Sequence, residues 1–328
     1  MMKKRVQKYL VTVIVLFFSA AMLAGPVLKE AAAQDKYPSR AIEYIIPWGP
    51  GGGGDQIGRK TGPILEKFLN VPFPVINVPG ATGGTGITKM LAAPADGHSI
   101  LLYIADTHAV LATSTASWKM TDLVPVARLM LCPSFLFVAE NSRFKSWADF
   151  EKEAKAKPGT LKVATLGFGS VDDITLSYLE GKGVKIIQVP YSKPSERYVS
   201  VLGTHVDALY EQAGDVRQYI TGKQIKPILI FGPQRLPAFK DVPCSREVGY
   251  DVGLPQFRSI VVKAGTDPKK VKVLSDAFGK VAATPEYKAF LGEHYATADS
   301  YLNNEECTKF ILSELDSMNK TWGAKKKK

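Results

Sequence analysis

The sequence predicts an α/β fold in which parallel β-strands are flanked by helices, and three observations favour this class. Short apolar runs alternate along the chain with amphipathic stretches of helical spacing, which is typical of βαβ units. Glycine-rich segments follow several apolar runs directly, as loops do at the carboxyl ends of parallel strands. The length of 328 residues and the hydrophobic content of 45% are sufficient for two ordinary domains or one large one.

The amino-terminal segment has the pattern of a secretory signal peptide. Basic residues within 3–8 precede the apolar run 9–24, and Ala31 and Ala33 form an A-x-A cleavage pattern before Gln34. We therefore expect a cleaved signal peptide and a mature protein in the periplasm, with an uncleaved anchor as the alternative. No second hydrophobic span and no lipid-accepting Cys follow the apolar run.

Five elements are expected in the first part of the mature chain. They are a strand at 42–46, a helix at Asp55–Leu69, a strand at 73–78, a helix at 86–93 and a strand at 98–104. The first helix is indicated by Ile57, Ile64, Leu65 and Phe68, which fall near one face. This order of strands and helices predicts a parallel sheet.

The same alternation returns after residue 146. Expected in order are a helix capped by Ser146 and ending at Ala156, a strand at 161–166, a helix from Asp172, a strand at 184–190, a helix around Val199–Leu202, a strand at 206–210, a short helix and a strand at 225–231. Asp267 and Thr284 each precede a proline, which predicts two helix starts, and a last helix is expected at about 304–322. Two longer apolar stretches, 126–140 and 257–265, are expected to be strands that cross between two lobes.

The formal net charge of +11 is concentrated at the ends of the chain. Residues 1–33 carry a net +4 and Lys325–Lys328 add four charges, so the body between them carries +3. This net charge of +3 argues against a surface that binds the phosphate backbone of a nucleic acid, and it is compatible with a small anionic ligand. Cys132, Cys244 and Cys307 lie far apart, so three isolated thiols are expected, with one long-range disulfide as the alternative.

The segment 46–60, IPWGPGGGGDQIGRK, has the Gly-x-Gly-x-x-Gly spacing of a dinucleotide-binding loop, beginning at Gly49. That motif needs an acidic residue at the end of the second strand, where this chain has Asn77 and Val78. A P-loop is excluded because no Gly-Lys-Ser/Thr follows the glycines. A nucleotide cofactor is therefore not expected.

Two further glycine-rich helix starts, 79–87 and 165–173, repeat the arrangement of the first. Glycines allow main-chain N–H groups to approach a ligand closely, and a helix amino terminus favours negative charge. Three such starts at the carboxyl ends of parallel strands predict a receptor for a small anion. For any single loop, a tight turn is the alternative.

Catalytic and metal-binding signals are weak. The four histidines show no metal-ligand spacing, and no Gly-x-Ser-x-Gly motif is present. His205 and His294 are expected at the surface, and His108 is a candidate for the cleft because it follows a strand. Asp172 and Asp173 could form a catalytic pair, but the start of a helix explains them better. No catalytic residue, metal or cofactor is therefore predicted.

Several segments resemble the Bug-type periplasmic substrate-binding proteins of tripartite tricarboxylate transporters. IPWGPGGGGD (46–55) is similar to the family's V-P-F-x-P-G-G-S/T-x-D loop, and NVPGATGGTGI (77–87) to its N-x-P-G-A-G-G-x-x-G segment. Further similar segments are APADGHSILL with THAV behind it, VPYSK, VLGTHVDALYEQ, FKDVPCSREVGY and VVKAGTDP. The resemblance covers nearly the whole mature chain, in order.

This resemblance implies a two-lobed, type II periplasmic-binding-protein fold that closes on a small carboxylate. The implied division is a signal peptide at 1–33, a first lobe of 34–136 plus 258–328 and a second lobe of 137–257. The implied ligand-binding residues are backbone donors at Gly53, Gly54, Gly83, Gly84 and Gly169, hydroxyls of Thr107 and Ser170, a wall at Tyr191, and also Trp48, Asp55, Asp173, Asp207 and Arg258. Of these, Asp55 is expected to organise its own loop, and Asp207 to be either structural or at the cleft.

The chain departs from the family pattern at three places. Gly53 and Gly54 replace a Ser/Thr pair, Asp173 replaces a histidine, and Phe257-Arg258 stands near the usual Trp/Phe. If Asp173 and Arg258 both face the cleft, an amino- or amide-bearing acid should bind better than a plain dicarboxylate. The alternative is that Asp173 caps its helix and Arg258 is solvated.

We therefore expect an exported, monomeric solute-binding protein that delivers a small organic acid to inner-membrane permease subunits. It would have no catalytic turnover, no cofactor and no nucleic-acid partner, and lobe closure would be its mechanism. A ligand-sensing module for a sensor kinase, or a periplasmic enzyme on the same scaffold, are the alternatives.

Overall fold

The computed structural model describes residues 36–113 and 116–323, and the chain divides into two compact units between Ser39 and Arg40. All helices and strands named below lie in the second unit. The predicted signal peptide, its cleavage point beside Gln34 and the tail Lys325–Lys328 lie outside the described residues. No helix in the described ranges combines the length and apolar character that a membrane crossing requires.

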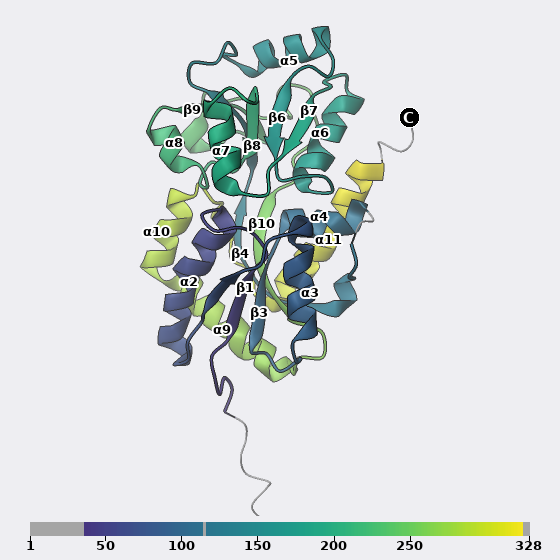
Figure 1. The fold of residues 1–328 in the computed structure, drawn as a ribbon. Coiled ribbons are helices and arrows are strands. Elements are labelled where there is room, and N and C mark those ends of the chain that lie inside the picture. Colours follow the sequence, from purple (N-terminus) through teal and green to yellow (C-terminus); the bar gives the residue numbers. More distant parts are fainter. Residues whose placement is uncertain (1–35, 114–115, 324–328) are drawn as a thin grey trace, which may run out of the picture. The chain divides into compact units, whose positions relative to one another are not determined.

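Two five-stranded sheets organise the second unit (Figure 1). The first has the order β2-β1-β3-β10-β4 and the second the order β7-β6-β8-β5-β9. The strands are β1 (Glu43–Ile46), β2 (Val75–Asn77), β3 (Ser99–Ile104), β4 (Leu123–Cys132), β5 (Ser134–Ala139), β6 (Lys162–Thr165), β7 (Ile187–Pro190), β8 (Ala208–Glu211), β9 (Ile225–Phe231) and β10 (Gln256–Lys263). In each sheet four strands share one direction, and only β10 or β5 runs against its neighbours. The predicted α/β class with mostly parallel sheets is confirmed.

Each sheet and the helices around it form one lobe. The first lobe contains α2 (Gly53–Leu69), α3 (Gly84–Ala92), α4 (Ala105–Thr113), α9 (Pro268–Ala283), α10 (Pro285–Glu293) and α11 (Asn304–Gly323). The second contains α5 (Trp147–Ala156), α6 (Val171–Gly181), α7 (Pro194–Leu202) and α8 (Arg217–Thr221). Three helix caps expected from the sequence form: Ser146, Asp267 and Thr284 each accept a hydrogen bond from an N–H of the following turn.

The side chains of β5 pack alternately into two hydrophobic clusters. Phe135 and Phe137 belong to one cluster, and Leu136 and Val138 belong to another. Successive side chains of a strand point to opposite faces, so both faces of the second sheet are covered. This explains why the strand reads as an unbroken apolar run.

The chain crosses between the lobes at Pro133, which separates β4 in the first sheet from β5 in the second. The predicted crossing in 126–140 is therefore confirmed. The predicted crossing in 257–265 is wrong, because β10 lies wholly in the first sheet and the return passes through the segment 232–255. The proposed lobe boundaries at 136/137 and 257/258 stay a prediction.

Helix α4 is the main element that the sequence analysis missed. It begins at Ala105, directly after β3, and its residues from Ala105 to Val110 are all buried. A helix buried on all sides lacks the apolar stripe from which helices are recognised. The three cysteines are buried and unpaired, which agrees with the expectation of isolated thiols.

Candidate functional site

The two lobes meet where the carboxyl ends of several strands lead into helices, and we call this region the seam. Several interactions between described residues join the lobes there, including an ion pair between Arg217 and Glu293. The Val171 N–H donates to Asp106 at 3.1 Å, the Thr82 hydroxyl donates to the Phe168 carbonyl at 3.4 Å, and Arg258 pairs with Asp215. Ligands of open α/β sheets bind at this end of the strands. The seam is therefore the candidate site.

Helix α2 begins at the seam with Gly53, two residues earlier than predicted. Its amino-terminal cap, Gly52, supplies no side-chain hydrogen bond. A Cβ placed on Gly53 would lie 2.1 Å from both Arg258 Nη2 and Asp215 Oδ2, so the position admits only glycine unless that pair moves. The first turn of α2 thus has no side-chain cap, and its N–H groups lie beside a buried ion pair.

Helix α3 also begins at a glycine cap without a side-chain hydrogen bond. That cap, Gly83, has φ +92°, a conformation that L side chains rarely adopt. A Cβ on it would lie 2.2 Å from Thr107 Oγ1. Thr107 is fully buried, and its hydroxyl has no hydrogen-bond partner among the residues the structure describes. Gly83 and Thr107, which were both predicted, are thus brought together.

In the third glycine-rich loop, 165–173, the hydrogen-bonding groups predicted to bind a ligand already bond to each other. The Gly169 N–H donates to Asp173 at 2.8 Å. The Ser170 hydroxyl donates to the Gly167 carbonyl and accepts from the Asp173 N–H, so it caps α6. The predicted roles of Gly169 and Ser170 as ligand donors are corrected to roles in holding this loop.

Asp173 likewise serves its own loop and helix. Its carboxylate accepts from Gly169 N–H, from the Ser177 hydroxyl and from Gln188 Nε2, the last at 2.7 Å. Arg258, in contrast, is 4% exposed and paired with Asp215, so the expected alternative of a solvated arginine is wrong. The two residues do not present the free opposite charges from which an amino-acid ligand was predicted.

Asp207 lies away from the seam. It is placed just before the first residue of β8, where its carboxylate accepts from the Lys162 N–H and pairs with Arg143. Of the two expected roles for Asp207, structural or at the cleft, these contacts favour the structural one. Asp55 organises its own loop as expected, since it accepts from the Gly51 N–H and from Arg59.

The remaining predicted residues lie around the seam without a demonstrated role. A Cβ on Gly54 would lie 3.1 Å from Leu102 in the first-lobe core. Gly84 lies against the Trp118 ring, and its N–H already donates to the Ala81 carbonyl. Trp48 is buried, and Tyr191 is half-buried at the end of β7. Their contact with a ligand stays a prediction.

Three of the four histidines are buried, namely His98, His108 and His294. His108 contacts the Tyr103 hydroxyl at 2.9 Å and the Ile311 carbonyl at 3.0 Å, and burial lowers its pKa to about 4. It therefore belongs to the core and not to the cleft. His294 was expected at the surface but is 7% exposed, in hydrogen-bond contact with Gln56.

The sequence analysis missed a buried group of six charged residues, which we call the seam cluster. Its members are Asp106, Asp172, Arg197, Glu211, Asp215 and Arg258, each no more than 7% exposed. Arg197 pairs with Glu211, and Arg258 pairs with Asp215. Asp106 accepts from Gln256 and from the Val171 N–H, and Asp172 accepts from the Leu166 N–H.

Burial raises the pKa of three carboxyl groups of the seam cluster, those of Asp106, Asp172 and Glu211. It raises the pKa of Asp106 to about 6 even though Gln256 and Val171 donate to it. The pKa of Asp172 is raised well above its usual range by burial and by the nearby charge of Asp106. Burial also raises the pKa of Glu211 to about 7, against the attraction of Arg197. These carboxyl groups retain protons at a pH where exposed ones have lost them.

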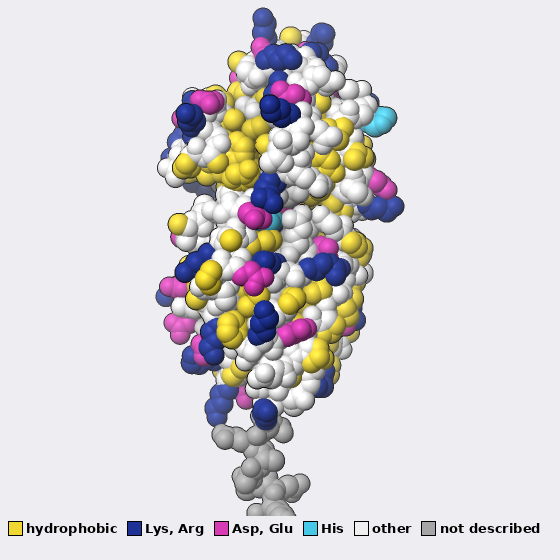
Figure 2. All heavy atoms as spheres, turned by 90° about the vertical axis from the view of Figure 1, so that its left-hand side faces the viewer, with side chains coloured by type: hydrophobic (Ala, Val, Ile, Leu, Met, Phe, Trp, Pro, Cys, Tyr) yellow, Lys and Arg dark blue, Asp and Glu magenta, His cyan; other side chains and the backbone are white. Residues whose placement is uncertain are grey.

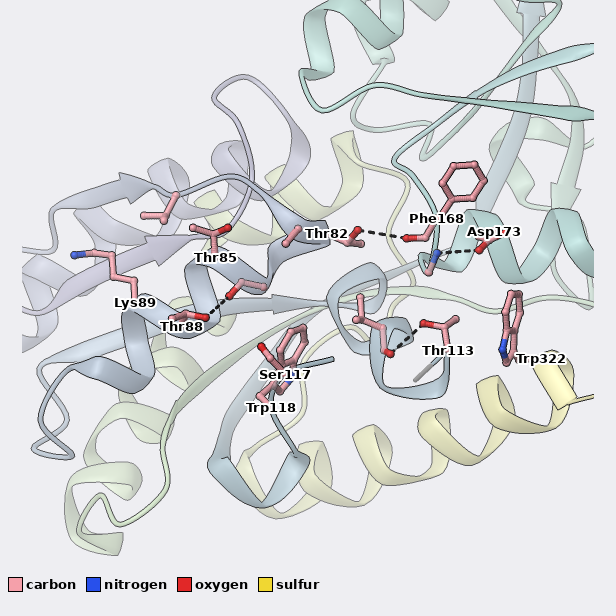
Figure 3. A pocket seen from close by; sticks show the side chains of 15 residues that line it. Thr82, Thr85, Thr88, Lys89, Thr113, Ser117, Trp118, Phe168, Asp173 and Trp322 are labelled. Atoms are coloured by element: carbon pink, nitrogen blue, oxygen red, sulfur yellow. Dashed lines mark hydrogen bonds between the residues drawn. The ribbon is translucent and has the colours of Figure 1, made fainter. Parts of the chain in front are cut away.

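Two hollows open beside the seam. One of about 790 Å³ is lined from both lobes, by Thr82, Trp118 and Trp322 of the first lobe and by Phe168 and Asp173 of the second (Figure 3). The second, of about 660 Å³, is lined by residues of α2, α8 and α10 together with Gly214 and Asp215. Figure 2 looks onto that side, where basic and acidic side chains lie close together. Ligand-sized space therefore reaches the seam from two directions.

The chain is similar to receptors of one transport family. Residues 57–323 match the family model described as Tripartite tricarboxylate transporter family receptor. Protein BugT of Bordetella pertussis is 29% identical over 296 residues, which cover 84% of this chain and 89% of that protein. A Cupriavidus necator protein described as UPF0065 protein in gbd 5'region is 27% identical over 294 residues, 89% of each chain.

Solved structures show the same fold. A TctC solute-binding protein from Polaromonas has 25% identity and a TM-score of 0.65, covering 88% of this chain and 99% of that one. MatC from Rhodopseudomonas palustris, with bound malate, has 22% identity and a TM-score of 0.80, covering 87% and 100%. R. palustris Rpa4515, with adipate, has 19% identity and a TM-score of 0.80, covering 88% and 98%. The predicted two-lobed periplasmic-binding-protein fold is confirmed.

Proposed function

Since the chain belongs to the tripartite tricarboxylate transporter family of receptors, we propose that it captures a small organic acid in the seam and delivers it to a membrane permease of that type. Receptors of this family bind solutes and are not enzymes. Closure of the lobes around the ligand is the mechanism. We also propose that the protein is exported to the periplasm after cleavage near Ala33 and acts there as a monomer.

The observation that carries this proposal is the uncapped start of α2 at the seam, together with the buried Thr107 hydroxyl at the neighbouring start of α3. Helix α2 begins at a glycine that supplies no side-chain cap, whereas at the start of α3 the N–H groups of Gly84 and Thr85 already donate to the carbonyls of Ala81 and Gly80. The Thr107 hydroxyl, which has no partner among the described residues, lies beside Gly83. First-turn N–H groups and a free hydroxyl together are suited to a carboxylate. Bound malate and adipate in two proteins of the same fold are consistent with this use of the seam.

The Gly83→Ala variant tests the proposal. The added Cβ would lie 2.2 Å from Thr107 Oγ1 and would have to be held at a positive φ, so the start of α3 must shift. We expect affinity for the tightest-binding acid of a panel of four- to six-carbon carboxylates to fall at least about tenfold by calorimetry, which corresponds to about 1.4 kcal/mol.

The Gly181→Ala variant is the matched control, because a Cβ on Gly181 meets nothing within 4 Å. It should bind like the unmodified protein. Equal affinity of the Gly83→Ala variant and this control would reject the start of α3 as part of the site. Permease delivery is tested separately, by loss of uptake of the same acid when the receptor gene is deleted.

A further inference from the structure

We propose that the two lobes hold each other closed in the absence of a ligand, because each lobe places one of its own carboxylates at a helix start of the other. Asp106 of the first lobe lies at the start of α6, and Asp215 of the second lobe lies at the start of α2. We call these two contacts the carboxylate latch. The latch concerns the protein without its ligand, so it goes beyond the proposed function and does not depend on which acid binds.

The first contact of the latch uses both oxygens of Asp106. This residue belongs to α4, which follows β3 directly, and it is 1% exposed. Its Oδ1 accepts from the N–H of Val171, the first residue of α6, at 3.1 Å, and its Oδ2 accepts from Gln256 Nε2 of β10 at 2.9 Å. First-turn N–H groups have no partner within their own helix and favour negative charge. A first-lobe carboxylate therefore fills a position at the start of a second-lobe helix.

The second contact of the latch runs in the opposite sense. Asp215 follows β8 in the second lobe, is 7% exposed and pairs with Arg258 of β10 in the first lobe. A Cβ on Gly53, the first residue of α2, would lie 2.1 Å from Asp215 Oδ2 and 2.2 Å from its Oδ1. The carboxylate thus lies against a helix start that has no side-chain cap. An acid that binds at this start has to take the place of Asp215.

Close packing between the lobes excludes water from the latch. Val171 and Ile174 of α6 are fully buried and belong to the same hydrophobic cluster as Ile311 of α11 in the first lobe. On another side, the Gly52 backbone packs against the start of α7, since a Cβ on Gly52 would lie 2.9 Å from Pro194 Cγ. Hydrogen bonds to a charged group are stronger where water is excluded.

The partners of the two carboxylates offset the cost of burying them. A carboxylate is costly to bury unless it is paired or hydrogen-bonded. Asp106 has a donor on each oxygen, and Asp215 has a guanidinium group. Opening exchanges these partners for water, whereas removing a carboxylate leaves its donors unsatisfied in the closed form alone. The latch therefore determines how often the seam is open to an entering ligand.

Removing either half of the Asp106 contact should open the ligand-free protein. In Asp106→Ala, the Val171 N–H and the Gln256 amide lose their acceptor in the closed form but are satisfied by water in the open form. Val171→Pro removes the donor instead, and proline is well tolerated as the first residue of a helix. Small-angle X-ray scattering of the ligand-free protein at pH 7.5 should show a larger radius of gyration for both variants. The curve of the unmodified protein should fit lobes in contact.

The Asp207→Ala variant is the matched control. Asp207 also accepts from a main-chain N–H and pairs with an arginine, but both partners, Lys162 and Arg143, lie in its own lobe. Its radius of gyration should equal that of the unmodified protein. Circular dichroism shows whether each variant is folded, and Val171→Pro carries the test if Asp106→Ala is not. Closed-form scattering from either folded variant, or open-form scattering from the unmodified protein, would overturn the inference and leave the proposed function intact.

Discussion

Replacing Gly53 by alanine tests whether the Arg258–Asp215 pair holds the lobes together. The new Cβ would lie 2.1 Å from an atom of each side chain, whereas ordinary contact begins at 3.4 Å, so both side chains must move by about 1.3 Å unless the start of α2 shifts. Both side chains are 5% exposed, so a displaced charge loses its partner without reaching water.

Loss of one partner from a buried ion pair costs about 3–5 kcal/mol, and alanine is favoured over glycine in a helix by about 1 kcal/mol. We therefore expect the free energy of unfolding to fall by about 2–4 kcal/mol. Urea denaturation followed by tryptophan fluorescence measures this change, because the midpoint moves to lower urea at an unchanged slope.

The control is Gly62→Ala in the same helix. A Cβ on Gly62 would lie 3.5 Å from its nearest atom, the Phe73 carbonyl oxygen, and would meet no charged group. This variant should be as stable as the unmodified protein or more stable by up to about 1 kcal/mol. Equal free energies of unfolding for the Gly53 and Gly62 variants would refute the reasoning. The 1.3 Å displacement of the ion pair would then have no effect on stability.

Three further predictions concern ionisation, thiols and export. Burial raises the pKa of Asp106 to about 6 and that of Glu211 to about 7. Between about pH 4 and 7 the folded chain therefore holds protons that the unfolded chain has released. The stability that these groups contribute is lost as the pH rises through this range. Urea midpoints measured across this pH range should show the loss of stability, and the Asp106→Asn variant should lose less. If the variant has the same pH profile as the unmodified protein, Asp106 does not contribute to the loss. The three buried cysteines should not react with a thiol reagent in the native protein at pH 8 and should give three equivalents after unfolding in guanidinium, whereas fewer would indicate a disulfide. Amino-terminal sequencing of the exported protein should begin at or near Gln34, and an intact first methionine would rule out cleavage.

The glycine-rich helix starts show which parts of the candidate site the local sequence pattern predicts. The glycines at 53 and 83 were singled out because a strand precedes and a helix follows them, and the structure places both at the seam. The third start, at 165–173, has the same pattern, but its donors are taken by Ser170 and Asp173. Pattern predicts where main-chain N–H groups are exposed at a helix start, and side-chain contacts decide whether they stay available.

Arg197 shows what the sequence does not reveal. It lies on a helix among ordinary polar residues, and nothing adjacent marks it as buried. Asp106 lies two residues after the strand at 98–104, a position that marks a candidate site residue, whereas the predicted His108 belongs to the core. Residues at the carboxyl ends of strands are the better candidates in an α/β protein.

The sequence by itself determined the α/β class, most strands and helix caps, and the resemblance to a receptor family, because these follow from periodicity and from residues adjacent in the chain. The composition of the seam was decided by the tertiary structure. Asp106, Arg197 and Arg258 come from α4, α7 and β10, and they meet only after the two sheets have packed and excluded water. Charge pairing and raised carboxyl pKa values both depend on that exclusion, which no local stretch of sequence contains.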